Sequence, residues 1–438
     1  MKKGFVALLL VLALVVLISP GIIGRLAENS VDDSLDWAVS DSSDILVTTT
    51  GFERSWFTSA GQHRIELLPG DLYYTLLAAF ASAATDTLPV LIIDTHLDHG
   101  LIPVSSMARE NGSLMPGLGS AISTLAIELA DGSVLPVPGT LFSRVGLTGE
   151  LQSRFVLEPG GIEADGVKLD WGETEFLFTT NPNSGSVGVV GALDSLAIES
   201  ADETMIVDKL EVDVDLAATS FGFMVGPAKI TLDSLAIVST EEATTAGPLY
   251  LESDSSIEDG RLNADVTFRI ENAPVPTGGS GGMELVMRLE EVDAEALGKL
   301  KRSIEAMPTG AVDAAARMDM ETELMRVLAS GMKLHFDQLD VSTPMGQFTS
   351  RLSAVVAASE DDDYTWASAL MVLDASAEFS FPEALVDLAI QFNPDLSAAI
   401  GMGFLRKRDD FYVMEAAFKQ GLLTVNGAPM PVPLTGWQ

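Results

Sequence analysis

Leu193-Asp-Ser-Leu-Ala-Ile198 is a six-residue sequence that occurs twice, because the same letters return as Leu232-Asp-Ser-Leu-Ala-Ile237. Looser copies of the pattern apolar-Asp-x-Leu-x-apolar occur at Val207–Val212 and Phe336–Val341. The copies lie at unequal distances along the chain, which argues against a strict solenoid repeat. We interpret the repeated sequence as a recurrent β-strand, and it predicts a mainly β fold.

Alternation within this strand predicts which side chains share a face, because successive residues of a strand point to opposite sides. The odd-numbered positions, including Leu193, are expected on one face of the first copy. The even-numbered positions, including Leu196 and Ile198, are expected on the other. Each face would therefore be partly apolar.

Strand patterns and Gly, Asn and Asp turns dominate residues 44–275, which we expect to form a β-rich region. This region begins with Asp44–Thr50, which is rich in β-branched residues. A second strand is expected at Leu88–Asp94, and a helix between the two at Leu72–Ala84.

A helical insertion is predicted for residues 283–332, after a glycine-rich loop or linker at Pro274–Gly282. Asp293 is a plausible N-cap for its first helix, and Met318–Leu328 is expected to form a second helix. Apolar residues recur at helical spacing in the first helix: Leu297, Leu300, Ile304 and Met307.

Residues 333–438 are predicted to be a β-rich C-terminal region with short helices. The two helices are expected at Pro382–Ile390 and Asp395–Met402, since proline is tolerated at the first helical position. The chain then reads as a hairpin with a last tight turn at Asn426-Gly427.

An uncharged run of 20 residues, Gly4–Ile23, follows Lys2 and Lys3. A helix of this length spans roughly 30 Å, the thickness of the bilayer hydrocarbon. The lysines favour a cytoplasmic N-terminus. We expect residues 1–25 to be a retained transmembrane anchor and residues 26–43 a helical stalk. A cleaved signal peptide, with Ser19 and Gly21 at the cleavage site, is the alternative.

The composition limits the possible partners. The chain has 438 residues and a net charge of −38, from 63 acidic and 25 basic residues. Nucleic acid is therefore not expected as a partner, because phosphate binding needs a basic surface. Apolar residues make up 47% of the chain, enough for a sizeable core, and cysteine is absent. Disulfides and thiolate metal sites are thereby excluded.

The sequence Asp94-Thr-His96-Leu-Asp98-His99-Gly100 resembles the metal-ligand run His-x-His-x-Asp-His of metallo-β-lactamase-type hydrolases. Zinc needs several converging nitrogen or oxygen ligands. Asp94 replaces the first histidine, and His335 alone could supply a later one. We therefore expect no catalytic residue, no metal ligand and no cofactor. A metal-assisted hydrolase centred on His96 and His99 remains the least favoured alternative.

Other candidate sites have simpler interpretations. Gly278-Gly-Ser-Gly-Gly282 matches the nucleophile elbow by letters, but a glycine-rich stretch after two prolines favours a flexible linker. Glu360–Asp363 could attract calcium, yet lacks the spacing of an EF-hand loop. Arg406-Lys-Arg408 could contact anionic lipid headgroups, or form a solvated turn. Trp56 and Phe57 are expected to pack.

Several stretches in order along the chain resemble the YdgA-like family of Gram-negative envelope proteins, known as domain of unknown function 945. The resemblance rests on the Lys-Lys anchor and on short matching sequences: Gly51–Phe57, Asp98–Gly100, Val167–Gly172, Leu339–Gly346 and Gly421–Pro429. It implies an inner-membrane-anchored protein that faces the periplasm, and it carries over no catalytic residue.

The sequence thus predicts an α+β fold that is predominantly antiparallel β. We expect an elongated body, residues 44–429, with helical insertions on a single N-terminal transmembrane helix. The function expected is a non-enzymatic, single-pass inner-membrane protein with its body in the periplasm, binding lipid or lipoprotein along a β groove. A scaffold that contacts other envelope proteins is the alternative.

Overall fold

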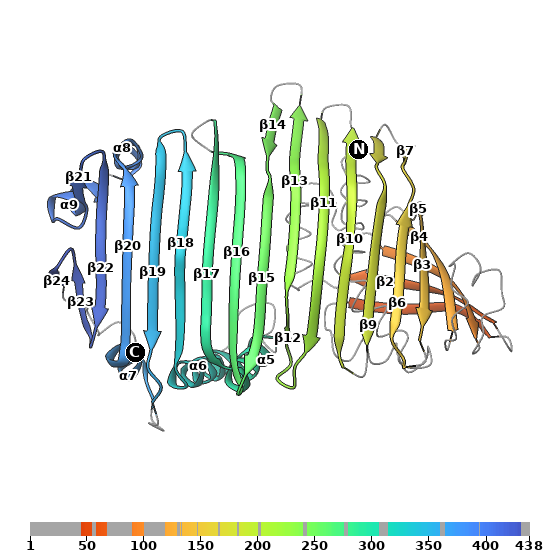
Figure 1. The fold of residues 1–438 in the computed structure, drawn as a ribbon, viewed down its shortest axis with the longest axis horizontal. Coiled ribbons are helices and arrows are strands. Elements are labelled where there is room, and N and C mark those ends of the chain that lie inside the picture. The colour runs from red at the N-terminus through yellow and green to blue at the C-terminus, as the bar shows by residue number, and fades with distance from the viewer. Residues whose placement is uncertain are drawn as a thin grey trace. The chain divides into compact units, whose positions relative to one another are not determined.

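The computed structural model describes residues 45–54, 58–67, 90–99, 119–128 and, apart from short gaps, 132–430 (Figure 1). The expected anchor at 1–25, the stalk at 26–43 and the helix at Leu72–Ala84 lie outside these residues. Among the residues that are described, no helix combines the length and the apolar composition needed to cross a bilayer. The fold is mostly antiparallel β with few helices, which confirms the predicted fold class at this level.

Two compact units divide the described chain. Unit 1 contains the strands up to Ala218, and Leu235–Ala243 also belongs to it. Its strands are β1 (Ile45–Arg54), β2 (Thr58–Leu67), β3 (Val90–His99), β4 (Gly119–Glu128), β5 (Val134–Val145), β6 (Leu151–Leu157), β7 (Gly160–Ala164), β8 (Val167–Trp171), β9 (Thr174–Asn181), β10 (Ser186–Glu199) and β11 (Glu203–Ala218).

Unit 2 contains Thr219–Ser234 and the described chain from Thr244 onward. Its strands are β12 (Met224–Val225), β13 (Ala228–Ser239, in part), β14 (Ala243–Ala246, in part), β15 (Leu249–Glu258), β16 (Arg261–Pro274), β17 (Ser280–Asp293), β18 (Met332–Thr343), β19 (Gly346–Val356), β20 (Leu373–Pro382), β21 (Arg406–Arg408), β22 (Phe411–Lys419), β23 (Leu422–Val425) and β24 (Ala428–Met430). Its helices are α5 (Ala294–Glu305), α6 (Ala314–Ala329), α7 (Trp366–Val372), α8 (Glu383–Phe392) and α9 (Asp395–Gly401).

Unit 1 is a curled antiparallel sheet with a closed core. Strands β1 to β6 pair in sequence order, β6 then pairs with β9, and β9 with β10. The first strands, red and orange in Figure 1, run across the direction of the later yellow strands of the same unit. One face is deeply buried, with Phe155 and Phe178 each 1% exposed and Ile198 0% exposed.

The apolar-Asp-x-Leu pattern marks strand irregularities. In the first copy Leu193 and Leu196 are both buried, so the expected alternation is wrong at this point. β10 changes partner here, from β9 at Leu193 to β8 at Leu196. Gly172 donates its backbone N–H to the carbonyl of Ser195 across the change, and the phase of the strand shifts.

The other copies lie at similar points. Lys209 in the copy on β11 has a φ of 46°. The pairing of β13 with β15 ends at Leu232, the first residue of the second copy. The pairing of β18 with β19 breaks between Phe336 and Leu339 in the fourth copy. Three of the four copies thus mark places where a strand shifts its register, changes its partner or ends a pairing, and the copy on β11 carries a left-handed residue. Such irregularities bend and twist a sheet locally.

Unit 2 is built on an antiparallel sheet in which β13, β15 to β20 and β22 pair as neighbours. Helices α5, α6 and α7 lie at one end of these strands and α8 lies at the other (Figure 1). Asp293 caps α5 as predicted, because its Oδ1 accepts a hydrogen bond from the Ala296 N–H at 2.8 Å. The two short helices predicted near residues 382 and 395 are α8 and α9.

The helical insertion predicted at 283–332 is wrong over its first eleven residues. Met283–Asp293 belongs to β17, which pairs with β16 and begins already at Ser280. The predicted linker at Pro274–Gly282 is correspondingly shorter, because β16 continues to Pro274. The glycines suggested a break in the sheet, but ladder hydrogen bonds on both sides hold this segment as a strand.

Asn426 completes the outer edge of β22. Strand β21 covers residues 411–413 of that edge and β23 covers residues 416–419. Between them, the Glu415 N–H donates to Asn426 Oδ1 at 2.9 Å, and the Asn426 N–H donates to the Glu415 carbonyl at 2.6 Å. Asn426 Nδ2 also donates to the carbonyls of Gly403 and Phe404. The predicted Asn426-Gly427 turn thus also satisfies the edge of a sheet.

Candidate functional site

The sheet of unit 2 has one face that is nearly all apolar. Residues directly opposite each other on paired strands point to the same face. One such row crosses β15 to β22 through Leu251, Phe268, Leu285, Leu339, Ser350, Phe379 and Met414. A second row crosses β15 to β18 through Leu249, Ile270, Met283 and Val341 and continues to Phe348 on β19. We call the side that carries these rows the apolar face.

The apolar face is only half-buried along the middle of the strands. Leu251, Phe268, Leu285, Leu339 and Phe379 are all of intermediate exposure. In a sheet, neighbouring side chains shield each other laterally across strands about 4.8 Å apart, but they do not cover each other's tips. Hydrocarbon tips on this face therefore remain in contact with water.

Apolar side chains of the sheet are fully buried at the strand ends that α5 and α6 cover. Leu262 and Val292, 7% and 1% exposed, form a cluster with Ala296 of α5 and Val327 of α6. Val356, at the last position of β19, is 9% exposed. The helices α5 and α6 thus close one end of the apolar face, while the apolar side chains at the strand centres keep their intermediate exposure.

Three phenylalanines gather on the apolar face at the end opposite α5 and α6. The ring centroids of Phe348 and Phe381 are 4.9 Å apart. Phe379 stacks on both neighbours at 6.2 and 6.5 Å. Such contacts contribute beyond area burial, and rigid aromatic rings offer a large contact surface. This end of the face thus presents a compact cluster of aromatic rings.

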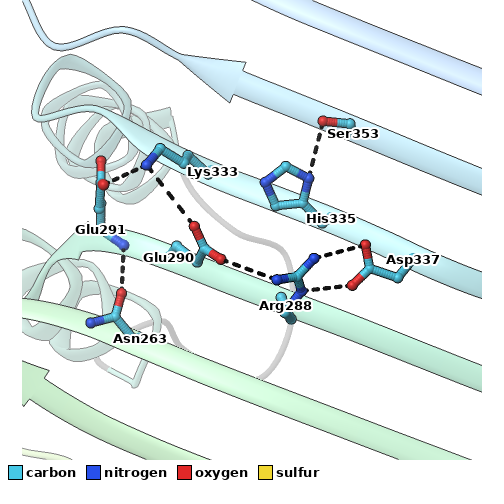
Figure 2. Close-up of polar contacts among 8 residues, drawn as sticks. All are labelled: Asn263, Arg288, Glu290, Glu291, Lys333, His335, Asp337 and Ser353. Atoms are coloured by element: carbon cyan, nitrogen blue, oxygen red, sulfur yellow. Dashed lines mark hydrogen bonds and ion pairs between the residues drawn. The ribbon is translucent and has the colours of Figure 1, made fainter.

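The opposite side of the same strands, which we call the charged face, carries a network of ion pairs (Figure 2). Arg288 on β17 makes a bidentate pair with Asp337 on β18, at 2.6 and 3.0 Å. Lys333 contacts Glu291 and, at 4.0 Å, Glu290. Register shifts place Asp337 and Glu291 on this side, because each stands at an irregularity of its strand.

Hydrogen bonds at the charged face also repair the gaps that these irregularities leave. Asn263 Oδ1 accepts the N–H of Glu291 at 3.0 Å, and Ser353 Oγ lies 3.1 Å from His335 Nδ1. The pKa of the Asp337 carboxyl is lowered, mainly by the hydrogen bond from the Arg288 guanidinium. The pKa of Lys333 is raised, mainly by its hydrogen bond to the carboxylate of Glu291. These charged groups thus pair with one another across β17 and β18 on the charged face.

The proposed metal run lies on β3 in unit 1. Asp94 Oδ1 accepts a hydrogen bond from Gln62 Nε2 at 2.9 Å, and His96 is exposed. Asp98 and His99 close the strand, opposite Thr58 and Gly119. Within the described ranges, no three His, Asp or Glu residues form a group that could hold a metal ion. The later candidate ligand, His335, belongs to unit 2.

Sequence reasoning missed His63, which is 6% exposed on β2. Its Nδ1 lies 2.9 Å from Thr49 Oγ1. Burial lowers its pKa, and the nearby carboxylate of Asp94 opposes that shift. His63 lies two residues before Ile65 on the same strand and therefore shares its buried face, which was the signal that could have placed it in the core.

The remaining candidates differ in position. Ser280 begins β17 and does not stand between a strand and a helix, as an elbow would require. Arg406–Arg408 forms β21, so the expected solvated turn is a short, exposed strand. Arg54 is the last residue of β1. Trp56, Phe57 and Glu360–Asp363 lie outside the described residues.

A two-faced antiparallel sheet, apolar on one side and ion-paired on the other, is the class of structure that unit 2 defines. The chain belongs to the family described as "Bacterial protein of unknown function (DUF945)", whose model matches residues 1–433. It is 23% identical over 222 residues to Protein YdgA of Escherichia coli (strain K12). That match spans 47% of this chain and 43% of the E. coli protein. No solved structure matches the chain significantly.

Proposed function

We propose that this chain is a non-enzymatic envelope protein, anchored in the inner membrane by residues 1–25, whose apolar face binds lipid hydrocarbon in the periplasm. The observation that carries the proposal is the half-burial of apolar side chains along the middle of unit 2, next to an end that α5 and α6 close. A sheet that stabilised the fold alone would bury this face completely.

The energetics favour a hydrocarbon ligand. Removing apolar surface from water contributes about 25 cal/mol per Å². An acyl chain that covers a few hundred Å² of this face supplies several kcal/mol before the costs of association. The methionines on the face, Met283 and Met414 among them, adapt to irregular hydrocarbon shapes because their side chains are unbranched and flexible.

The proposal is tested by photo-crosslinking at two adjacent residues of β17. Leu285 points to the apolar face and Val286 to the charged face, and both are half-buried. A photoreactive phenylalanine analogue replaces each in turn in the full chain, expressed in a Gram-negative host with labelled acyl chains. We expect labelled lipid on the chain after illumination at position 285 and little at position 286.

The same experiment separates the alternatives. Crosslinking of position 285 to one discrete protein, without lipid, would contradict lipid binding and favour the scaffold function. Equal lipid labelling at both positions would indicate nonspecific contact with the membrane and would contradict a face-specific site.

A further inference from the structure

The apolar face ends at a single cation. Its second row passes from Phe348 to Phe381, whose rings are 4.9 Å apart, and on to Tyr412 and then Lys407. Lys407 is the one charged residue among the described strand positions that the paired registers of β13 and β15 to β24 assign to this face. Because the rest of the apolar face carries no charged strand residue in the described chain, the position of Lys407 at its margin suggests a binding role.

Lys407 is accessible although it has a partner. Its side chain is 51% exposed, and its Nζ contacts the carboxylate of Glu383 at the start of α8. An ammonium group has three donors, so this contact leaves others for a ligand. A lysine can also lay its aliphatic stem along apolar surface while its charge stays in water.

The charges around Lys407 are mixed. Arg406 and Arg408 flank it on β21, and Arg408 pairs with Glu415 at 3.7 Å. Acidic groups nearby are Glu383 and Asp387 of α8, together with Asp409 and Asp410 in the following turn. The local balance does not favour a broad anionic surface. The donors of Lys407 that Glu383 leaves free can instead hold one small anionic group at a defined point beside the aromatic cluster.

We propose that the ligand of the apolar face is an amphiphile with an anionic headgroup, whose phosphate or carboxylate binds Lys407 while its hydrocarbon lies along the rows of the sheet. This inference rests on the proposed function, because it needs a hydrocarbon ligand on the face. The Phe348, Phe379 and Phe381 cluster holds the part of the chain nearest the headgroup, and the rest of the chain runs along the rows toward β15.

The test uses the full chain in nanodiscs of zwitterionic lipid and two photoactivatable probes with the same alkyl chain. One probe is a dodecyl phosphate and the other a dodecyl maltoside. Labelling of the β17 to β22 peptides against probe concentration gives an apparent Kd for each probe. We expect the phosphate probe to bind about tenfold more tightly, which corresponds to about 1.4 kcal/mol.

Two matched variants assign the effect. Lys407→Gln should reduce the preference to within about twofold without changing labelling by the maltoside probe, which also reports that the sheet is folded. Lys419→Gln is the control, because Lys419 lies on the charged face, where it pairs with Asp374 at 2.6 Å. We expect this variant to prefer the phosphate probe over the maltoside probe as strongly as the unmodified chain does.

The possible failures are distinguishable. Equal affinity for both probes, or a preference that survives Lys407→Gln, would overturn the headgroup inference and leave lipid binding intact. Displacement of the phosphate probe by inorganic phosphate as well as by dodecyl phosphate would show a plain anion site and also overturn it. Absence of labelling by either probe on the apolar face would overturn both this inference and the proposed function.

Discussion

Units 1 and 2 use the same alternating sequence pattern with different results. In unit 1, Phe176 and Phe178 alternate with exposed Glu175 and Leu177, and both rings are at most 2% exposed. In unit 2, Leu285 on β17 follows the same alternation but stays half-buried. The difference shows that alternation determines which side chains share a face, whereas the curl of the sheet decides whether that face becomes a closed core.

The largest expected difference between the units is the cost of losing a core ring. Phe155→Ala in unit 1 should destabilise its sheet by about 3–5 kcal/mol, because it leaves a cavity in a closed core. Phe268→Ala on the apolar face should cost about 1–2 kcal/mol, since the ring is already partly in water. Hydrogen exchange of the β6 and β16 peptides during denaturant unfolding measures both. Equal costs would contradict the contrast between the units.

A smaller effect is expected at the outer edge of unit 2. Asn426→Gly removes the side-chain hydrogen bonds to Glu415, Gly403 and Phe404 but tolerates the φ of 51°. We expect a loss of about 1–3 kcal/mol, seen as faster exchange of the β22 amides. Leu422→Ala, at an exposed position of β23 on the same edge, is the control and should change exchange little. Unchanged β22 exchange in Asn426→Gly would contradict the role assigned to this residue.

Acid should weaken unit 1 through His63. Its folded pKa lies below the ordinary 6.5, so the unfolded chain binds a proton more readily than the folded one. The contribution of the neutral His63 to the free energy of unfolding is fully present above pH 6.5 and is lost as the pH falls through its folded pKa. The protection of the β2 amides, corrected for the pH dependence of intrinsic amide exchange, should therefore fall between neutral and mildly acidic pH.

His63→Gln should remove this part of the pH dependence, and His96→Gln, at an exposed position of the neighbouring strand, should keep it. A pH dependence that is identical in the unmodified chain and in His63→Gln would show that another group is responsible.

The smallest effect is expected on the charged face. Asp337→Asn breaks the bidentate pair with Arg288, but both side chains are well exposed, at 39% and 45%. Exposed ion pairs contribute about 0–1 kcal/mol, so the free energy of unfolding of unit 2 should change by less than about 1 kcal/mol. Urea unfolding at low and high salt measures it. A loss of several kcal/mol would show that this network holds the sheet together.

Sequence patterns were sufficient for the antiparallel β class, for Asp293 as a helix cap and for the Asn426-Gly427 turn. They were sufficient because each depends on local chemistry. The strand at Met283–Asp293 was missed, since its hydrogen bonds come from β16 and β18 and not from its own residues. The shifts in strand phase at Leu193 and Phe336 were missed for the same reason.

The candidate site was harder to predict than the fold. The sequence pattern around Leu285 or Phe379 does not distinguish a half-buried face from a closed core, because exposure depends on what covers the sheet. The basic sequence Arg406-Lys-Arg408 was visible, but its relation to the aromatic rings depends on the pairing of Lys407 with Tyr412. His63 was missed because a lone histidine carries no motif.

The most direct test of the apolar face is its lipid content. The full chain with a protease site at residue 43 is cleaved from membranes without detergent, and the released body is examined by native mass spectrometry and lipid extraction. Bound lipid at a fixed ratio, lost in Leu285→Glu and retained in Val286→Glu, is the predicted result. A released body that is free of lipid and equally stable in both variants would contradict the account.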